Sequence, residues 1–107
     1  DYVFTNGRLA RGRYVRLLYT PSPDGTTRYG VVVGKKLCNA AWRNRGKRML
    51  REAARRLFSR TVPGYWIVLS LRKSGMHMKS DDIKNDVASL LQECALVGSD
   101  KVEGNLR

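Results

Sequence analysis

The chain is poor in the residues that most enzymes use for chemistry. Its 107 residues include two cysteines, one histidine and nine acidic residues. Cys38 and Cys94 are too few and too far apart for a disulfide framework or a zinc site, so we expect both to be buried free thiols in a reducing cytoplasm. His77 has no obvious serine, cysteine or carboxylate partner for acid–base chemistry. We therefore assign no catalytic residue to this chain.

Long apolar runs and acidic clusters are also missing. No segment approaches the roughly 18 apolar residues of a membrane-spanning helix, and no signal peptide is visible, so we expect a cytoplasmic protein without a membrane partner. Residues 1–80 hold only three acids, too few for a nuclease that binds its own metal ions. Asp81, Asp82 and Asp86 lie close together, but helix capping and solvation explain them, and we predict no metal site.

Positive charge, by contrast, is abundant. The formal net charge is +12, and residues 1–80 contain 18 of the basic residues. Residues 81–107 reverse the balance, with six acids against three bases. Such an excess indicates a polyanionic partner, and its distribution places the binding surface in the first three quarters of the chain.

The basic residues are densest from Arg43 to Arg56, where seven of them stand against one acid, Glu52. On a helix, the apolar residues would share one arc and the basic ones the opposite side. The arc consists of Gly46, Met49, Leu50, Ala53 and Leu57; the basic ridge consists of Arg43, Lys47, Arg51 and Arg55, with Asn44 and Arg48 among them. Like charges at this spacing destabilise an isolated helix by about 0.2–0.5 kcal/mol per pair. Because a solvated surface, the alternative, normally mixes both signs, we infer contact with nucleic acid.

Periodicity and turn signals predict a small mixed sheet covered by helices. The expected elements are a helix end within residues 1–7, strands over 13–20, 29–34 and 65–71, a long helix from about Ala40 to Arg60 capped by Asn39, and a last helix capped by Ser80. The turn at 21–27 suggests antiparallel pairing of the first two strands, and the nearly continuous apolar run at 65–71 predicts a central strand. We expect one domain over residues 1–97 and a flexible tail over 98–107.

Further candidates for RNA contact flank the predicted elements. Lys35 and Lys36 leave the second strand, and Lys73 leaves the central one. Aromatic residues near basic ones allow bases to stack while the backbone follows positive charge. Phe4 and Tyr19 fit this pattern, although each aromatic residue on its own is more often part of the core.

The segment KKLCNAAWRNRGKRMLREAARR, residues 35–56, resembles the signature of the bacterial ribonuclease P protein subunit. The matching positions are Lys35, Lys36, Asn39, Arg43, Asn44, Arg45, Lys47, Arg48, Leu50, Arg51, Glu52 and Ala53. The resemblance covers roughly residues 2–96. The departures from the family pattern include Cys38, where glycine is usual, and Gly46, which replaces an aliphatic residue.

The resemblance implies an α+β fold, an α/β sandwich whose β-α-β crossover is left-handed, as in some ribosomal proteins and a domain of elongation factor G. It also implies a partnership with a catalytic RNA. That RNA, with Mg²⁺ held mainly by the RNA, removes the 5′ leader of precursor tRNA as an endoribonuclease, and no obligate protein partner is expected. The alternative is a ribosomal or other structured-RNA binding protein without a processing role.

The resemblance further divides the candidate residues between two surfaces. The helix residues that would face the catalytic RNA are Arg43, Asn44, Arg45, Lys47, Arg48 and Arg51. A cleft between sheet and helices, with Phe4, Tyr19 and Lys73, would receive the single-stranded leader. Lys35 and Lys36 lie between the two surfaces and belong to neither assignment.

Overall fold

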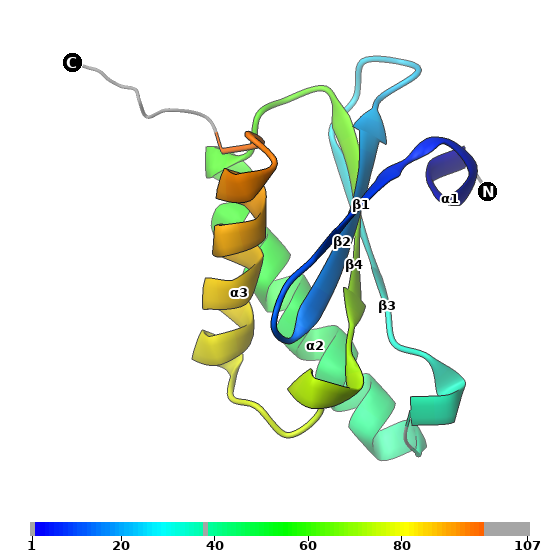
Figure 1. Cartoon of the computed structure of the whole chain (residues 1–107), viewed down its shortest axis with the longest axis vertical. Coiled ribbons are helices and arrows are strands. Elements are labelled where there is room, and N and C mark those ends of the chain that lie inside the picture. The colour runs from blue at the N-terminus through cyan, green and yellow to red at the C-terminus, as the bar shows by residue number, and fades with distance from the viewer. Residues whose placement is uncertain (1, 38, 98–107) are drawn as a thin grey trace.

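The computed structural model describes residues 2–37 and 39–97 and forms a sheet with helices on both sides (Figure 1). Its elements are α1 (Tyr2–Asn6), β1 (Arg8–Arg11), β2 (Val15–Pro21), β3 (Arg28–Val32), the short 3-10 helix η1 (Lys35–Leu37), α2 (Ala40–Leu57), η2 (Phe58–Arg60), β4 (Tyr65–Leu71), η3 (Lys73–Gly75) and α3 (Ser80–Glu93). The predicted α+β sandwich is confirmed. Cys38 and the predicted tail at 98–107 lie outside the described residues.

The sheet has the strand order β1-β2-β4-β3. Strand β2 pairs antiparallel with both β1 and β4, whereas β3 pairs parallel with β4. The predicted central position of β4 is therefore confirmed. The predicted antiparallel pairing of the first two long strands is wrong: the turn after β2 does reverse the chain, but β4 is inserted between β2 and β3. The short edge strand β1 was not predicted.

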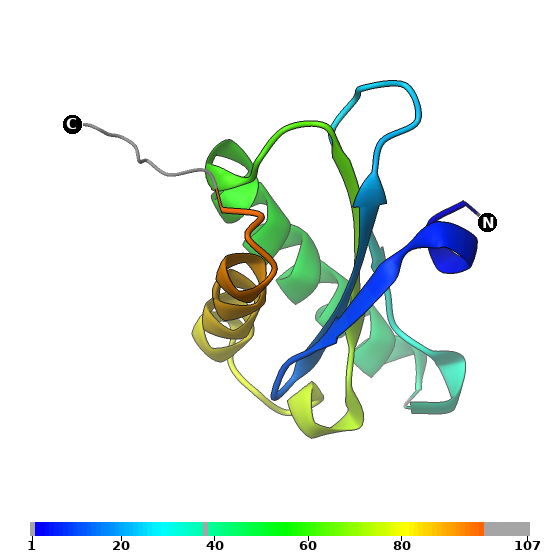
Figure 2. The same cartoon turned by 45° about the horizontal axis from the view of Figure 1, so that its top comes forward.

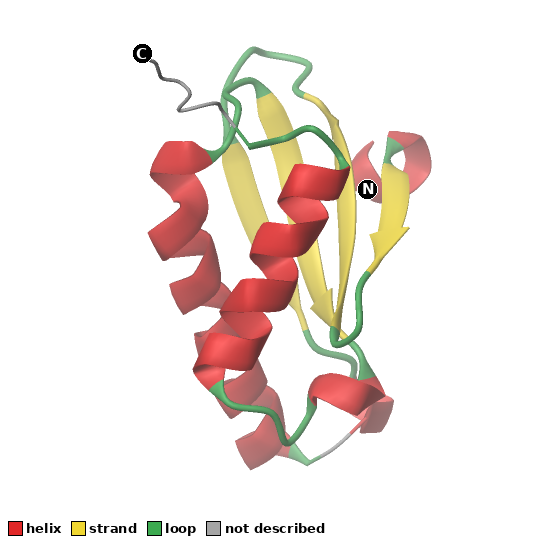
Figure 3. Ribbon diagram, turned by 60° about the vertical axis from the view of Figure 1, so that its left-hand side comes forward, coloured by secondary structure: helices red, strands yellow, loops and turns green. Residues whose placement is uncertain are grey.

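Helices α2 and α3 form one layer, and α1 lies alone on the other side of the sheet (Figure 2). The connection from β3 through α2 to the parallel strand β4 is left-handed, as Figure 3 shows from the helix side. This agrees with the predicted crossover and departs from the general right-handed rule. None of the helices in the described residues is long and apolar enough to cross a membrane.

The core fills the space between the sheet and the α2–α3 layer. Leu17, Leu69 and Leu71 from the sheet are fully buried against Leu50 of α2 and Leu91 of α3. The predicted apolar arc of α2 faces this core: its buried residues are Gly46, Met49, Leu50, Ala53, Ala54 and Leu57. The arc therefore fixes which side of α2 faces outward.

Gly46 permits the close approach of α2 to the sheet. A Cβ atom at this position would lie 2.9 Å from Leu71 Cδ2 and 3.2 Å from Val33 Cγ2. The family usually has an aliphatic residue at this position. Here the side chains of Leu71 and Val33 occupy the space that it would fill. The expectation that a missing Cβ lets the helix lie close to the sheet is confirmed.

The opposite face of the sheet is only partly covered. Residues that are paired across the sheet share a face, and the row containing Leu18, Val68 and Gly30 lies on the side away from α2 and α3. On this open face Leu9 is 47% exposed and Val32 is 39% exposed. Helix α1 contacts β2 and β4. Coverage is therefore confined to one end of the face, and apolar and basic side chains remain in contact with solvent.

Asp86 of α3 fastens the helix layer to the turn between β1 and β2. Its carboxylate accepts hydrogen bonds from the backbone N–H groups of Arg13, Tyr14 and Val15, at 3.1, 2.8 and 2.9 Å. The predicted cap of this helix is wrong, because Lys79 occupies the N-cap position and Ser80 is already helical. Asp81 and Asp82 lie in the first turn as expected, where their charges favour the helix dipole.

Candidate RNA interface

The basic face of α2 is positioned by the helix start and by the apolar arc. Asn39 is the N-cap, as predicted, and its side chain accepts a hydrogen bond from the Trp42 backbone N–H at 3.0 Å. Because the arc is buried against the sheet, the residues on the other side of the helix are directed outward. The sequence pattern therefore predicted the orientation of this helix correctly.

The outward side carries most of the residues that the family resemblance assigns to the catalytic RNA. Asn44, Arg48 and Arg51 are exposed, whereas Arg43 and Lys47 are half-buried. Arg48 and Arg51 form no hydrogen bond or ion pair with any described residue, so their charge is available to a ligand. Acid is present at one end only, where Glu52 pairs with Arg56 at 3.5 Å. This surface can bind a chain of phosphates.

Arg45 has a partner within the protein. Its guanidinium group donates to the backbone carbonyls of Met76 and Met78, at 3.1 and 3.0 Å, and lies 5.2 Å from the ring centroid of Trp42. The Trp42 ring in turn meets His77 edge-on at 4.7 Å. RNA contact by Arg45 remains a prediction, and the structure adds a second role: the side chain holds the loop after η3 against the start of α2.

Lys35, Lys36 and Lys73 lie at one end of the sheet. Val32 and Ser70 are paired across β3 and β4, and Lys35 and Lys73 lie three residues after Val32 and Ser70, respectively. All three lysines are exposed. Since the loop after η3 contacts the first turns of α2 through Arg45, this end of the sheet extends the basic face of that helix. Lys73 therefore lies with Lys35 and Lys36.

Tyr19 lies elsewhere. It pairs with Ile67, six residues before Lys73, which corresponds to about 20 Å along an extended strand. Its half-buried ring is 6.2 Å from that of Tyr65, in a depression that also includes Cys94 at the end of α3. Burial, with smaller contributions from Cys94, raises the pKa of the Tyr19 hydroxyl, which therefore stays protonated at neutral pH. Cys94, predicted to be a buried free thiol, is free but only half-buried.

Phe4 is on α1, on the other side of the sheet from the α2–α3 layer, and is 55% exposed. The Tyr19 ring points to the helix-covered face, because Tyr19 follows the buried residues Val15 and Leu17 at two-residue spacing along β2. The structure thus does not bring Phe4, Tyr19 and Lys73 together into one cleft. Their roles in leader binding remain predictions about separate positions.

Sequence reasoning missed the open face of the sheet. Arg11 pairs with Arg16, and Arg28 pairs with Trp66, whose ring centroid lies 5.3 Å from the Arg28 guanidinium carbon. Alternation along β2 could have identified Arg16, but β1 is only four residues long and β3 is interrupted by Gly30. Arg11 and Arg16 meet across consecutive strands, whereas Arg28 shares their face only because β3 pairs with β4, a strand distant in sequence.

Comparison with known proteins identifies the family. A family model described as Ribonuclease P matches residues 1–95. The chain belongs to the ribonuclease P protein family. A ribonuclease P protein component from Symbiobacterium thermophilum is 35% identical over 96 residues, which span 89% of this chain and 84% of that protein. One from Thermus oshimai is 51% identical over 91 residues, which span 85% of this chain and 57% of that protein.

Solved structures agree with this assignment. The ribonuclease P protein from Thermotoga maritima matches with a TM-score of 0.77 and 25% identity, over 96% of this chain and 90% of that one. As a ribonuclease P protein component, the chain works with an RNA in an endoribonuclease of tRNA processing. The resemblance stated from residues 35–56 is confirmed.

Comparison with Arg48 tests whether Arg45 also stabilises the fold. Arg45→Ala leaves the carbonyls of Met76 and Met78 without a charged donor, so we expect its free energy of unfolding in urea to fall by about 1–3 kcal/mol. Arg48→Ala, the control, removes an exposed cation and should change that value by about 0.5 kcal/mol or less. Equal urea midpoints for the two variants would show that the guanidinium group does not hold the loop.

Proposed function

We propose that this chain is the RNA-binding subunit of a bacterial ribonuclease P whose catalytic RNA hydrolyses the phosphodiester at the 5′ end of precursor tRNA. The observation that carries this proposal is the outward face of α2, whose cations Arg48 and Arg51 have no partner in the described residues. Those residues also contain no group of three or more His, Cys, Asp or Glu side chains that could hold a metal ion. The protein contributes binding, and the RNA contributes the reacting groups.

The basic face of α2 serves the catalytic RNA. Each phosphate neutralised by a fixed cation releases a condensed counterion, so several contacts along one helix give strong but salt-sensitive binding. Lys35, Lys36 and Lys73 extend this surface at one end of the sheet. Family membership supports this role over that of a ribosomal protein without a processing function.

The protein's own carboxylates do not fit a resident magnesium site. Asp86 uses its oxygens to accept hydrogen bonds from three backbone N–H groups, and Asp81 and Asp82 lie in the first turn of α3, where their charges favour the helix dipole. We therefore propose that Mg²⁺ is held mainly by the RNA. We also propose a cytoplasmic location, where precursor tRNA is processed, and no obligate protein partner.

The 5′ leader meets the protein at separated points. Phe4 offers an exposed ring, and Tyr19 lies in a depression whose lining includes Asn6 at the end of α1 and Arg8. Both aromatic residues can stack with unpaired bases. Lys73 lies about 20 Å along the sheet from Tyr19, so a single leader reaches both only when several of its nucleotides are extended.

Reconstitution tests the proposed function. With a bacterial ribonuclease P RNA, the protein should promote magnesium-dependent 5′ cleavage of precursor tRNA, whereas the protein alone should not cleave at any magnesium concentration.

If five or six cations contact phosphates, a plot of log affinity for the catalytic RNA against log salt should have a slope of about −4 to −5. Arg48→Ala should make that slope less steep by about one unit, because one phosphate contact is lost.

Lys84→Ala serves as the control in this titration, because Lys84 lies on α3 outside the basic face. It should leave the slope unchanged. Cleavage by the protein alone that survives ribonuclease treatment and disappears when a carboxylate is mutated would contradict the division of labour. An unchanged slope for Arg48→Ala would remove this residue from the interface.

Leader length should separate Tyr19 from Lys73. Tyr19→Ala should weaken binding of leader-bearing precursor tRNA to the holoenzyme by about 1–3 kcal/mol through loss of a base stack. Lys73→Ala should give a salt-dependent loss, and the two deficits should appear at leader lengths that differ by several nucleotides. The measurement is affinity for a series of leaders, with mature tRNA as the control. Equal losses for mature tRNA would show that neither residue contacts the leader.

A further inference from the structure

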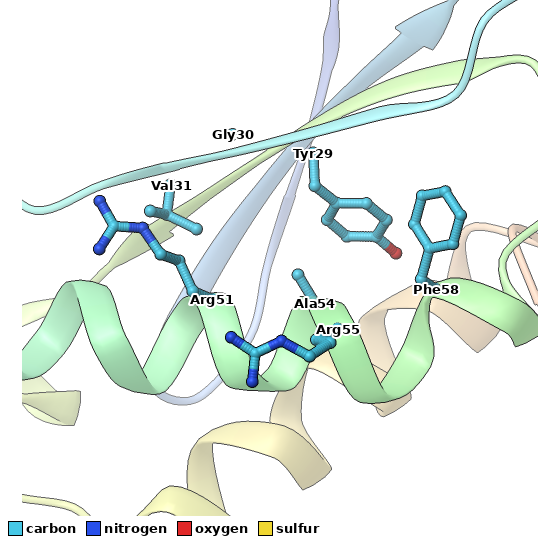
Figure 4. Close-up of a pocket in the computed structure, with 7 residues that line it drawn as sticks. All are labelled: Tyr29, Gly30, Val31, Arg51, Ala54, Arg55 and Phe58. Carbon is cyan, nitrogen blue, oxygen red and sulfur yellow. The ribbon is translucent and has the colours of Figure 1, made fainter.

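A groove between β3 and α2 lies beside the basic face of α2 and shares Arg51 with it. It has a volume of about 630 Å³ and is open to solvent. Residues from the two elements and the start of η2 line it: Tyr29, Gly30, Val31, Arg51, Ala54, Arg55 and Phe58 (Figure 4). Its lining combines apolar, aromatic and basic groups and contains no acid, a composition suited to a flat ligand that carries negative charge.

One end of the groove is an aromatic platform. The Phe58 ring is 49% exposed and lies 6.1 Å from the Tyr29 ring, at an interplanar angle of 53°. Tyr29 is held in place through Thr61, whose hydroxyl lies 2.6 Å from the Tyr29 hydroxyl and donates to the Leu57 carbonyl at 2.8 Å. Phe58 is thus backed by a fixed neighbour while half of its surface remains free for contact.

The other end of the groove is cationic. Arg51 and Arg55 are exposed and form no hydrogen bond or ion pair with any described residue. Arg51, Arg55 and Phe58 follow one another at intervals of four and three residues, which places them on one side of the helix with neighbouring Cβ atoms about 5–6 Å apart. Figure 4 shows both arginine side chains on α2, with that of Arg51 extending toward Val31, at the opposite end of the groove from Tyr29 and Phe58.

The third wall is the edge of the sheet. Within residues 2–37 and 39–97, strand β3 is paired on one side only, because it is the last strand in the order β1-β2-β4-β3. An edge strand leaves alternate backbone N–H and C=O groups without a strand partner. Such groups can form hydrogen bonds with the edge of a base that is stacked on Phe58.

We propose that this groove binds one unpaired nucleotide of RNA, with its base on Phe58, its phosphate at Arg55 and the adjoining phosphate at Arg51. The assignment rests on the proposed function, in which α2 faces RNA, and extends it from charge contacts to a defined nucleotide pocket. The shared ligand chemistry can come from the catalytic RNA or from precursor tRNA, and the experiment distinguishes these two sources.

The first test compares variants of the platform and of the cations. Phe58→Ala and Phe58→Leu should each weaken RNA binding by about 5- to 150-fold, with the salt slope unchanged, because a base stack is lost. Phe58→Leu retains an apolar side chain beside Tyr29 and guards against a folding defect. Arg55→Ala should make the salt slope less steep by about one unit. Arg56→Ala, the matched control, removes the neighbouring arginine that pairs with Glu52 and should have a smaller effect.

The second test reads the contact directly and identifies its source. Holoenzyme is assembled with isotopically labelled catalytic RNA and unlabelled precursor tRNA, or with the labels reversed, and irradiated with ultraviolet light. Mass spectrometry should find one nucleotide attached to the peptide containing Phe58, and its label reports which RNA supplied it. Loss of this adduct in Arg55→Ala, but not in Arg56→Ala, would support the predicted phosphate position.

The outcomes distinguish the groove from the general proposal. If the Phe58 variants bind both RNAs with unchanged affinity and no adduct forms at Phe58, the nucleotide pocket is wrong while the function of α2 stands. If hexaglutamate, rather than RNA, protects the β3 amides from hydrogen exchange, the groove is a protein docking site and the proposal is overturned. Failure of the unmodified protein to bind catalytic RNA would refute the proposed function itself.

Discussion

The contact between α2 and the sheet is the interaction on which the rest of this structure depends. Gly46 lets the helix approach Leu71 and Val33, and the remainder of the arc continues the contact along the helix. This single interface fixes the β3–α2–β4 crossover, covers one sheet face and sets the rotation of the helix. Every outward cation is placed by this rotation.

Magnitudes show why a helix so rich in like charge is stable here. Each i, i+4 pair of like charges costs about 0.2–0.5 kcal/mol. Full burial of a leucine or methionine side chain contributes about 1.5–3 kcal/mol, and Leu50, Leu57 and Met49 are all buried. Packing on one side of α2 therefore outweighs repulsion on the other. The repulsion is relieved when RNA phosphates approach, which favours binding.

Periodicity within single elements was a reliable guide to this chain. The arc of α2, the Asn39 cap and the central position of β4 depend on residues close together in sequence, and all three predictions are confirmed. Strand pairing depends on segments far apart. The reversal after β2 was visible in the turn at 21–27, but nothing local indicated that β4 would be inserted between β2 and β3.

In the candidate site, too, features set by residues close together in sequence were predicted, and features set by tertiary contacts were not. The outward position of Arg48 and Arg51 was predicted from helical spacing alone. The hydrogen bonds of Arg45 with the loop at 76–78, and the position of Lys73 beside Lys35, arise from tertiary contacts that no local pattern contains. The groove at Phe58 likewise requires β3 and α2 to be neighbours.

Chemical mapping of arginines tests the central claim most directly. Arginine side chains are modified with phenylglyoxal, in the free protein and in its complex with catalytic RNA alone, and quantified by mass spectrometry. We predict that catalytic RNA protects Arg48 and Arg51, while Arg11 and Arg16 on the open sheet face react as in the free protein. Protection of Arg11 and Arg16, with Arg48 and Arg51 as reactive as in the free protein, would contradict the claim that α2 is the surface facing the catalytic RNA.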